Sequence, residues 1–138
     1  MSHYQRRRPI TVLDSRFEGR SLELYTLDGE KLLGLVDEVS QNEIGMLVEG
    51  SPVIIPRSSI LYIATGLSDI HGHGECCESE YVLDEDLIGS EVSVKLVNGG
   101  EVSGRVMKLT RSEIGIVQGN RAVIVPRTSI IYVKILRR

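Results

Sequence analysis

Hydrophobic and polar residues alternate along several short segments of the chain, and the same pattern occurs twice. Residues 22–27 alternate and end at Asp28-Gly29, and residues 92–97 alternate and end at Asn98-Gly99. Asp-Gly and Asn-Gly between alternating runs are strong signals for a two-residue β-hairpin turn. We therefore expect the first two strands of each copy to be antiparallel neighbours.

A second repeated feature is an apolar run, a Pro-Arg-hydroxyl break and another apolar run ending in Tyr-Ile or Tyr-Val. It occupies residues 53–63 and again residues 123–133. Proline has no backbone donor and therefore ends a strand ladder. Each stretch predicts two short strands, the fourth and fifth of its copy, joined by a tight turn.

The two copies align without a gap at a shift of 70 residues. Residues 12–64 align with 82–134, and seventeen of these 53 pairs are identical. Units this small bury only about 60% of their unfolded surface, so each needs the other or further chains. The division expected from this duplication is a flexible basic arm, a first unit, a flexible linker and a second unit, at residues 1–9, 10–66, 67–81 and 82–138.

Each unit begins with an Asp at a helix-capping position, Asp14 or Asp84, and a Gly ends the short run after it. Paired glycines inside the second and third strands indicate bends or bulges. The predicted fold is mainly β, with two tandem five-stranded bent-sheet barrels, each preceded by a short helix.

This order of elements resembles the Sm-like (Lsm and Hfq) superfamily. The residues that carry the resemblance are Leu24, Gly29, Gly34, Val36, Leu47, 53–55 and 60–63 in the first unit and Val94, Gly99, Gly104, Val106, Val117, 123–125 and 130–133 in the second. The resemblance implies a ring in which the fourth strand of one unit pairs with the fifth strand of the next, around a pore that binds RNA. Tandem chains would close such a ring as a trimer with six units. The residues expected at the interface are Val53, Ile54, Ile55, Ile60, Tyr62, Val123, Ile124, Val125, Ile130 and Tyr132.

The family's usual nucleotide pocket is altered in this chain. Its Asp position is occupied by Ser40 and Thr110, its Asn position by Ile44 and Ile114, and its Arg-Gly pair by Pro56-Arg57 and Pro126-Arg127. Each arginine could bind phosphate through its forked guanidinium, or it could pair with a carboxylate of the same or the next unit, such as Glu43 or Glu113. The candidate RNA-binding residues are Arg57, Ser58, Arg105, Lys108, Arg111, Ser112, Arg121, Arg127, Thr128 and the arm residues Arg6, Arg7 and Arg8.

Composition limits the function further. The net charge is −3, but the second unit carries nine basic and six acidic residues, so it is the more plausible partner of an anion. No apolar run approaches a membrane span and no signal-peptide core follows the arginines, so a cytoplasmic location without membrane contact is expected. No catalytic constellation or phosphate-cradling motif recurs, and the chain is not expected to be an enzyme.

Two alternatives to an RNA-binding ring remain open. The acidic balance and the altered pocket suit a ring scaffold that binds protein partners and no nucleic acid. The linker also gathers four potential zinc or copper ligands, although adjacent cysteines strain a tetrahedral site, and a disordered linker with reduced thiols is the simpler interpretation. These four residues are His71, His73, Cys76 and Cys77.

Overall fold

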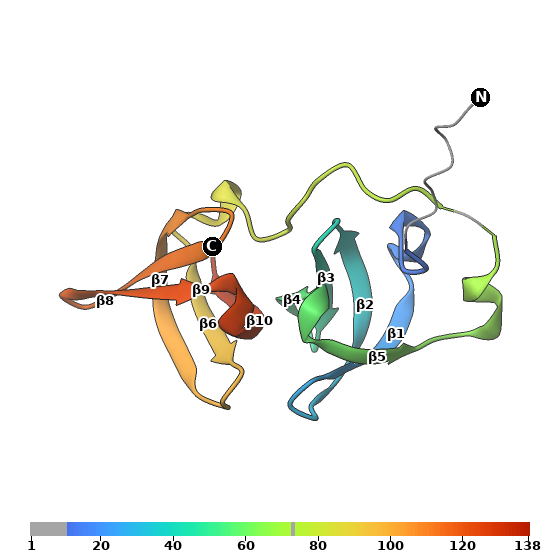
Figure 1. Cartoon of the computed structure of the whole chain (residues 1–138), viewed down its shortest axis with the longest axis horizontal. Coiled ribbons are helices and arrows are strands. Elements are labelled where there is room, and N and C mark those ends of the chain that lie inside the picture. Colours follow the sequence, from blue (N-terminus) through green and yellow to red (C-terminus); the bar gives the residue numbers. More distant parts are fainter. Residues whose placement is uncertain (1–10, 73) are drawn as a thin grey trace.

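The structure, a computed structural model, describes residues 11–72 and 74–138 and is mainly β (Figure 1). Ten strands form one antiparallel sheet in the order β5-β1-β2-β3-β4-β10-β6-β7-β8-β9. The strands of the first unit are β1 (Ser21–Thr26), β2 (Lys31–Val39), β3 (Glu43–Val48), β4 (Ser51–Pro56) and β5 (Ile60–Ala64). Those of the second unit are β6 (Glu91–Leu96), β7 (Glu101–Leu109), β8 (Glu113–Gln118), β9 (Arg121–Pro126) and β10 (Ile130–Arg137).

The predicted hairpins are confirmed in both units. Leu24 lies opposite Leu32 in the β1–β2 pair, and Val94 lies opposite Val102 in the β6–β7 pair. The turn glycines Gly29 and Gly99 have φ angles of 91° and 88°. Glycine adopts this left-handed conformation without a steric penalty, which explains its place after Asp28 and Asn98.

The Pro-Arg stretches also form the tight turns that the sequence predicts. Each is a single 3₁₀ turn, η3 (Arg57–Ser59) between β4 and β5 and η6 (Arg127–Ser129) between β9 and β10. Pro56 and Pro126 are the last residues of their strands. The two turns are therefore equivalent structures at equivalent places.

The short helix expected before each unit is only a three-residue 3₁₀ turn. These turns are η2 (Ser15–Phe17) and η5 (Glu85–Leu87). Asp14 and Asp84 cap them, each accepting a hydrogen bond from the backbone N–H two residues later. The chain is already extended again at Glu18 and Ile88, which leaves too few residues for an α-helical turn.

Each unit has its own hydrophobic core, and the cores exchange a residue where the units meet. The first cluster contains Phe17, Leu24 and Ile44. The second contains Leu87, Val94 and Ile114, and it also contains Ile54 from β4. Tyr132 from β10 packs against the first cluster. Neither core is completed by its own unit alone, which matches the expectation that such small units need a neighbour.

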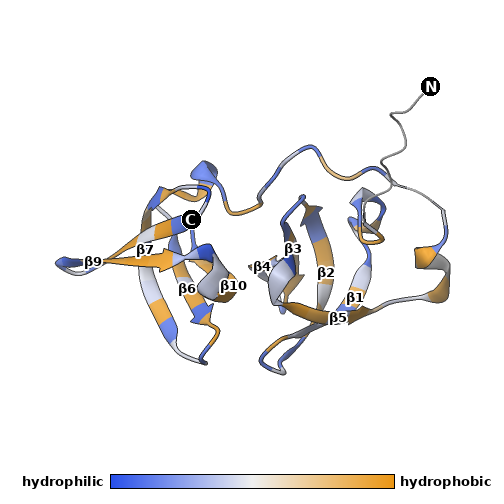
Figure 2. Ribbon diagram, viewed as in Figure 1, coloured by the Kyte–Doolittle hydropathy of each residue, from blue (hydrophilic) through white to orange (hydrophobic). Residues whose placement is uncertain are grey.

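The sheet is open, and the predicted closure of each unit into a barrel is not seen. Within the described residues the fourth and fifth strands of one unit do not pair with each other. Instead β4 pairs with β10 of the other unit, with Ile54 opposite Val133 and Val53 opposite Lys134. The sheet thus ends in two free edges, β5 of the first unit and β9 of the second, both largely hydrophobic (Figure 2).

The linker, expected to be flexible, follows the surface of the first unit after a 3₁₀ turn, η4 (Leu67–Ile70) (Figure 1). Backbone hydrogen bonds join Ser15 N–H to the Glu75 carbonyl, Gln41 N–H to Ser79 and Asn42 N–H to Glu80, at 3.0–3.3 Å. These loop amides have no ladder partner of their own, so the linker satisfies them.

Membrane crossing by a helix is not available to the described part of the chain, because none of its helices has the necessary length and apolarity.

Candidate functional site at the junction of the two units

The two units are joined by more than the β4–β10 ladder. The hydroxyl of Ser59 in η3 donates a hydrogen bond to the carbonyl of Ile130 at 2.5 Å. This bond links the Pro-Arg turn of the first unit to the first residue of β10. The loops that the sequence singles out therefore lie at the junction.

Arg127 is held firmly in this junction. Its Nη1 donates to Glu43 Oε2 at 2.9 Å, its Nε to the Thr110 carbonyl at 3.0 Å and its Nη2 to the Leu83 carbonyl at 2.9 Å. The guanidinium also lies 4.1 Å from the centre of the Tyr81 ring, within cation–π range. Of the two roles considered for Arg127, the ion pair with a carboxylate of the other unit is present, while phosphate binding stays a prediction.

Glu43, the partner of Arg127, is almost fully buried, with 3% of its side chain exposed. Its Oε1 accepts hydrogen bonds from the backbone N–H groups of Val82 and Leu83 at 2.6 and 2.7 Å. Burial raises the pKa of the Glu43 carboxyl, and the donors on Leu83, Arg127 and Val82 oppose that rise. One carboxylate from the first unit thus satisfies three donors from the second.

Arg57 repeats most of this arrangement but lacks the carboxylate. Its Nε and Nη2 donate to the Ser40 carbonyl at 3.3 and 3.0 Å, and its Nη2 also reaches the Leu13 carbonyl at 2.9 Å. Burial lowers the pKa of the guanidinium. Within residues 11–72 and 74–138, no carboxylate forms an ion pair with Arg57.

A second ionic cluster crosses the junction, and the sequence did not indicate it. Lys95 pairs with Asp28 at 2.9 Å and with Glu30, and the Tyr132 hydroxyl donates to Glu30 at 3.1 Å. The equivalent positions in the other copies are Tyr25, Asn98 and Gly100. Because none of these charges is repeated, a search for features shared by both units passes over them.

Replacing Lys95 by methionine is expected to remove an acid-sensitive part of the stability. Hydrogen bonds from Lys95 and Thr26 lower the pKa of Asp28 below its usual 3.8. A carboxylate with a lowered pKa stabilises the folded state above the unfolded pKa, and this contribution is lost as pH falls through the folded pKa. Urea midpoints should therefore fall less steeply below pH 3.8 for Lys95→Met than for the wild type. Parallel pH profiles would contradict this role.

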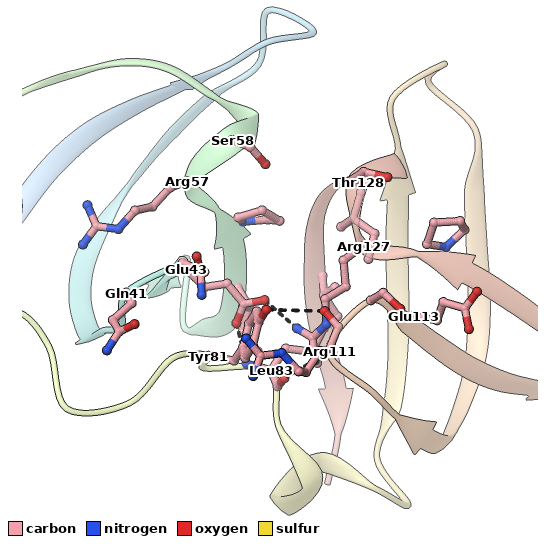
Figure 3. A pocket seen from close by; sticks show the side chains of 17 residues that line it. Gln41, Glu43, Arg57, Ser58, Tyr81, Leu83, Arg111, Glu113, Arg127 and Thr128 are labelled. Carbon is pink, nitrogen blue, oxygen red and sulfur yellow. Dashed lines mark hydrogen bonds and ion pairs between the residues drawn. The ribbon is translucent and has the colours of Figure 1, made fainter.

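A pocket of about 600 Å³ opens where the loops of the two units face each other (Figure 3). Its walls combine apolar strand residues with amide, hydroxyl, guanidinium and carboxylate groups. The lining residues are Gln41, Asn42, Glu43, Ile54, Pro56, Arg57, Ser58, Tyr81, Leu83, Arg111, Ser112, Glu113, Pro126, Arg127, Thr128, Ile130 and Val133.

The pocket gathers half of the residues predicted to bind RNA. Those in its lining are Arg57, Ser58, Arg111, Ser112, Arg127 and Thr128. Others lie on strands away from it, where Arg105 pairs with Glu91 at 3.4 Å and Arg121 bonds to Gln118. Lys108 is exposed on β7. Arg6, Arg7 and Arg8 lie outside the described residues.

Sequence reasoning missed Tyr81, Gln41 and Asn42, which line the same pocket. Tyr81 belongs to the segment that we interpreted as a flexible linker, and it enters the wall because the linker is bound to the first unit. Gln41 and Asn42 follow the altered Asp position at Ser40, and their N–H groups hold the linker in place. Their loop position was the available signal, since functional residues often lie on loops.

The residues predicted at an interface between units divide into three groups. Val53, Ile54, Ile130 and Tyr132 lie at the β4–β10 junction, with Tyr132 half-buried. Ile55 and Val125 are buried in the cores. The remaining four lie on the free edge strands, namely Ile60, Tyr62, Val123 and Ile124.

The three candidate metal ligands within the described residues, His71, Cys76 and Cys77, do not form a metal-binding cluster. Cys76 and Cys77 form a disulfide bond with each other, in place of the reduced thiols expected from the sequence. Among the described residues, no three His, Cys, Asp or Glu side chains form a cluster that could hold a metal ion. His73 lies outside those residues, so a metal site that includes it stays a prediction.

No family model matches the chain, and no curated protein matches it.

Proposed function

We propose that the chain is a non-catalytic, Sm-like, ring-forming subunit that binds RNA in the pocket between its units. The β4–β10 pairing carries the assembly part of this proposal. It joins the fourth strand of one five-stranded unit to the fifth strand of another, which is the contact that the family resemblance implies. In this chain the contact is made internally, between two copies of the unit.

The free edges support repetition of that contact between chains. β9 is the fourth strand of the second unit and β5 is the fifth strand of the first, so they correspond to β4 and β10. Unpaired hydrophobic edge strands are prone to association, and pairing removes the exposed edge. A head-to-tail contact of this kind uses different surfaces on the two partners and must close to avoid a filament. Three chains would give a closed ring of six units.

The pocket lining supports RNA as the ligand. Arg111 is 79% exposed and offers a guanidinium for phosphate. The Tyr81 ring, which has the Arg127 guanidinium 4.1 Å from its centre, offers its other face for base stacking. The Gln41 and Asn42 side chains each donate one hydrogen bond to the linker, at 3.0 and 3.1 Å, and offer their carbonyl oxygens for base edges. The hydroxyls of Ser58 and Thr128 lie on opposite walls and offer further polar groups (Figure 3). Phosphate, base edge and base face are thus each matched by a group in one pocket.

A protein-binding ring without nucleic acid is the second candidate, favoured by one observation. The two arginines of the Pro-Arg turns, which the sequence suggested as phosphate ligands, already donate to carbonyl groups, and Arg127 also to Glu43. Binding RNA through Arg127 would require breaking these bonds, whereas Arg57 could use only Nη1, which has no acceptor among the described residues. Arg111, whose hydrogen bond to Glu80 is exposed and 3.3 Å long, is the residue chosen for the test.

The first test is mass by light scattering with absorbance at 260 and 280 nm, followed by binding of labelled oligouridylate and oligoadenylate. We expect three chains, or a stacked pair of such rings, and Arg111→Ser should weaken RNA binding about tenfold and flatten its salt dependence. Arg105→Ser removes an equally charged residue outside the pocket and should change binding little. A ring that retains neither RNA would favour the protein scaffold, and a stable monomer would reject ring assembly.

A further inference from the structure

We propose that Glu113 is the inter-chain counterpart of Glu43. In an assembled ring its carboxylate would bind Arg57 Nη1 and the backbone N–H groups of Val12 and Leu13 of the neighbouring copy. This inference rests on the head-to-tail assembly proposed above, and it identifies a contact that would join one chain to the next in that assembly.

The pattern for this contact is present inside the chain. Glu43 follows the loop between the second and third strands of the first unit, and there it receives Val82 N–H, Leu83 N–H and Arg127 Nη1 at 2.6–2.9 Å. Moving each of the four residues by 70 positions gives Glu113, Val12, Leu13 and Arg57, with the same residue type in every case. We call the set of Glu43 with its three donors the internal clamp. The chain therefore also carries the residues of a second clamp, namely Glu113 as the acceptor and Val12, Leu13 and Arg57 as the donors.

The acceptor half of the second clamp is vacant. Glu113 is exposed and lies at the start of β8, as Glu43 lies at the start of β3. Its backbone follows the same pattern, with the Thr110 amide bonded to the Glu113 carbonyl as the Ser40 amide is to Glu43. No side chain in residues 11–72 and 74–138 forms an ion pair or hydrogen bond with the Glu113 carboxylate.

The donor half is vacant in the same way. Arg57 uses Nε and Nη2 for the Ser40 and Leu13 carbonyls, just as Arg127 uses these atoms for Thr110 and Leu83. In Arg127 the remaining Nη1 binds Glu43, whereas Arg57 Nη1 has no acceptor among the described residues. The guanidinium is thus already oriented for a carboxylate that the described residues of its own chain do not supply.

The backbone amides of Val12 and Leu13 complete the donor set. Their counterparts on Val82 and Leu83 both bind Glu43, but neither Val12 N–H nor Leu13 N–H has an acceptor among the described residues. Leu13 is 9% exposed. Buried backbone donors nearly always have a hydrogen-bond acceptor, so an acceptor is expected for the Leu13 N–H group.

Apolar side chains on the two free edge strands, β5 and β9, are exposed where their counterparts at the internal junction are buried. Ile54 on β4 is 4% exposed, whereas its counterpart Ile124 on β9 is 67% exposed. Ile131 on β10 is 1% exposed, whereas its counterpart Leu61 on β5 is 59% exposed. Apolar residues that the internal junction buries are therefore left in solvent at the chain's two ends, one on each side of the proposed contact.

The junction between chains would depend on the Glu113 clamp more than the junction between units depends on the Glu43 clamp. The internal junction has the additional Lys95 cluster with Asp28 and Glu30. At the outer edges the corresponding residues are Tyr25, which stacks on Tyr62 at 4.5 Å within its own chain, and the uncharged Asn98 and Gly100. Loss of the Glu113 charge should therefore separate chains without separating units.

The test is light scattering on the full-length chain with Glu113→Lys, beside Glu85→Lys as an exposed control of the same charge change. We expect Glu113→Lys to be monomeric with an unchanged circular dichroism spectrum, and Glu85→Lys to assemble as the wild type does. Assembly of Glu113→Lys at wild-type concentrations would overturn the clamp and leave the ring proposal standing. A monomeric wild type would overturn the ring proposal itself.

A mixing experiment tests the direction of the contact. Leu61→Asp places a charge on the β5 edge and leaves Glu113 intact, whereas Glu113→Lys leaves β5 and Arg57 intact. Each variant alone should be monomeric, and their mixture should form a dimer of one copy of each through the remaining pair of edges. A mixture that stays monomeric would overturn the pairing of Glu113 with the edge that carries Arg57.

Discussion

Replacing Glu43 by alanine should lower the free energy of unfolding by about 3 kcal/mol or more, the range found when one partner of a buried ion pair is removed. The change leaves Arg127 Nη1 without its carboxylate and leaves the N–H groups of Val82 and Leu83 without an acceptor. Each donor left unsatisfied in a buried site carries a desolvation cost. Urea denaturation at neutral pH measures the difference.

Glu113→Ala is the matched control for Glu43→Ala, because the two residues occupy the same position in the two units. Glu113 is exposed and has no side-chain partner within the described chain. At concentrations where the wild type is monomeric, its replacement should change stability by less than about 0.5 kcal/mol. Equal losses from the two substitutions would mean that Glu43 does not hold the units together as the contacts indicate.

The strand pattern and the turns were predictable from the sequence because they depend on short-range physics. Alternation and the Asp28-Gly29 and Asn98-Gly99 pairs determine the hairpins locally, and the Pro-Arg stretches determine the 3₁₀ turns. The Asp caps were also identified correctly, but they begin a 3₁₀ turn where a short helix was expected. The length of a capped segment depends on where the chain must re-enter the sheet, which a local pattern does not contain.

The partner of each edge strand could not be read from the sequence in the same way. The apolar character of residues 53–56 and 130–133 predicts that both strands pair, but closure within a unit, pairing between units and pairing between chains all satisfy that prediction. The structure shows the second of these at β4 and β10. The position of the linker is a similar case. Three of its hydrogen bonds join backbone groups that every sequence shares, and the side chains of Asp14, Gln41 and Asn42 bind its backbone through ordinary polar groups.

The candidate site was predicted where both units carry the same residue and missed where they differ. Arg57 and Arg127 were identified because they repeat, and the carboxylate alternative for Arg127 names the pair that is present. Lys95, Asp28, Glu30 and Tyr81 have no repeated counterpart, yet they lie at the junction or in the pocket. Residues that differ between the two copies therefore make the contacts that are found only at the internal junction.

Gly104→Ala should strongly destabilise the second unit, with a loss of about 3 kcal/mol, the upper end for overpacking. A Cβ at this position would lie 2.4 Å from the Val117 carbonyl oxygen and 2.7 Å from Ile116 Cγ2. The carbonyl belongs to a paired strand of the sheet, so β7 and β8 must separate to make room. The first unit's Gly34 has the same relation to Leu47, at 2.2 Å.

Gly115→Ala provides the control, because Gly115 lies in a strand of the same unit and its φ angle is not positive. A Cβ there would meet only ordinary contacts, the nearest being Lys108 Cβ at 3.5 Å. Alanine also restricts the unfolded chain, so the variant should match the wild type or gain up to about 1 kcal/mol in urea denaturation. If Gly104→Ala and Gly115→Ala proved equally stable, the close approach of β7 and β8 at Gly104 would be wrong. A large gap between them would instead show that Gly104 is required by the close contact between the β7 and β8 backbones, and that a strand glycine without such a contact, such as Gly115, is not.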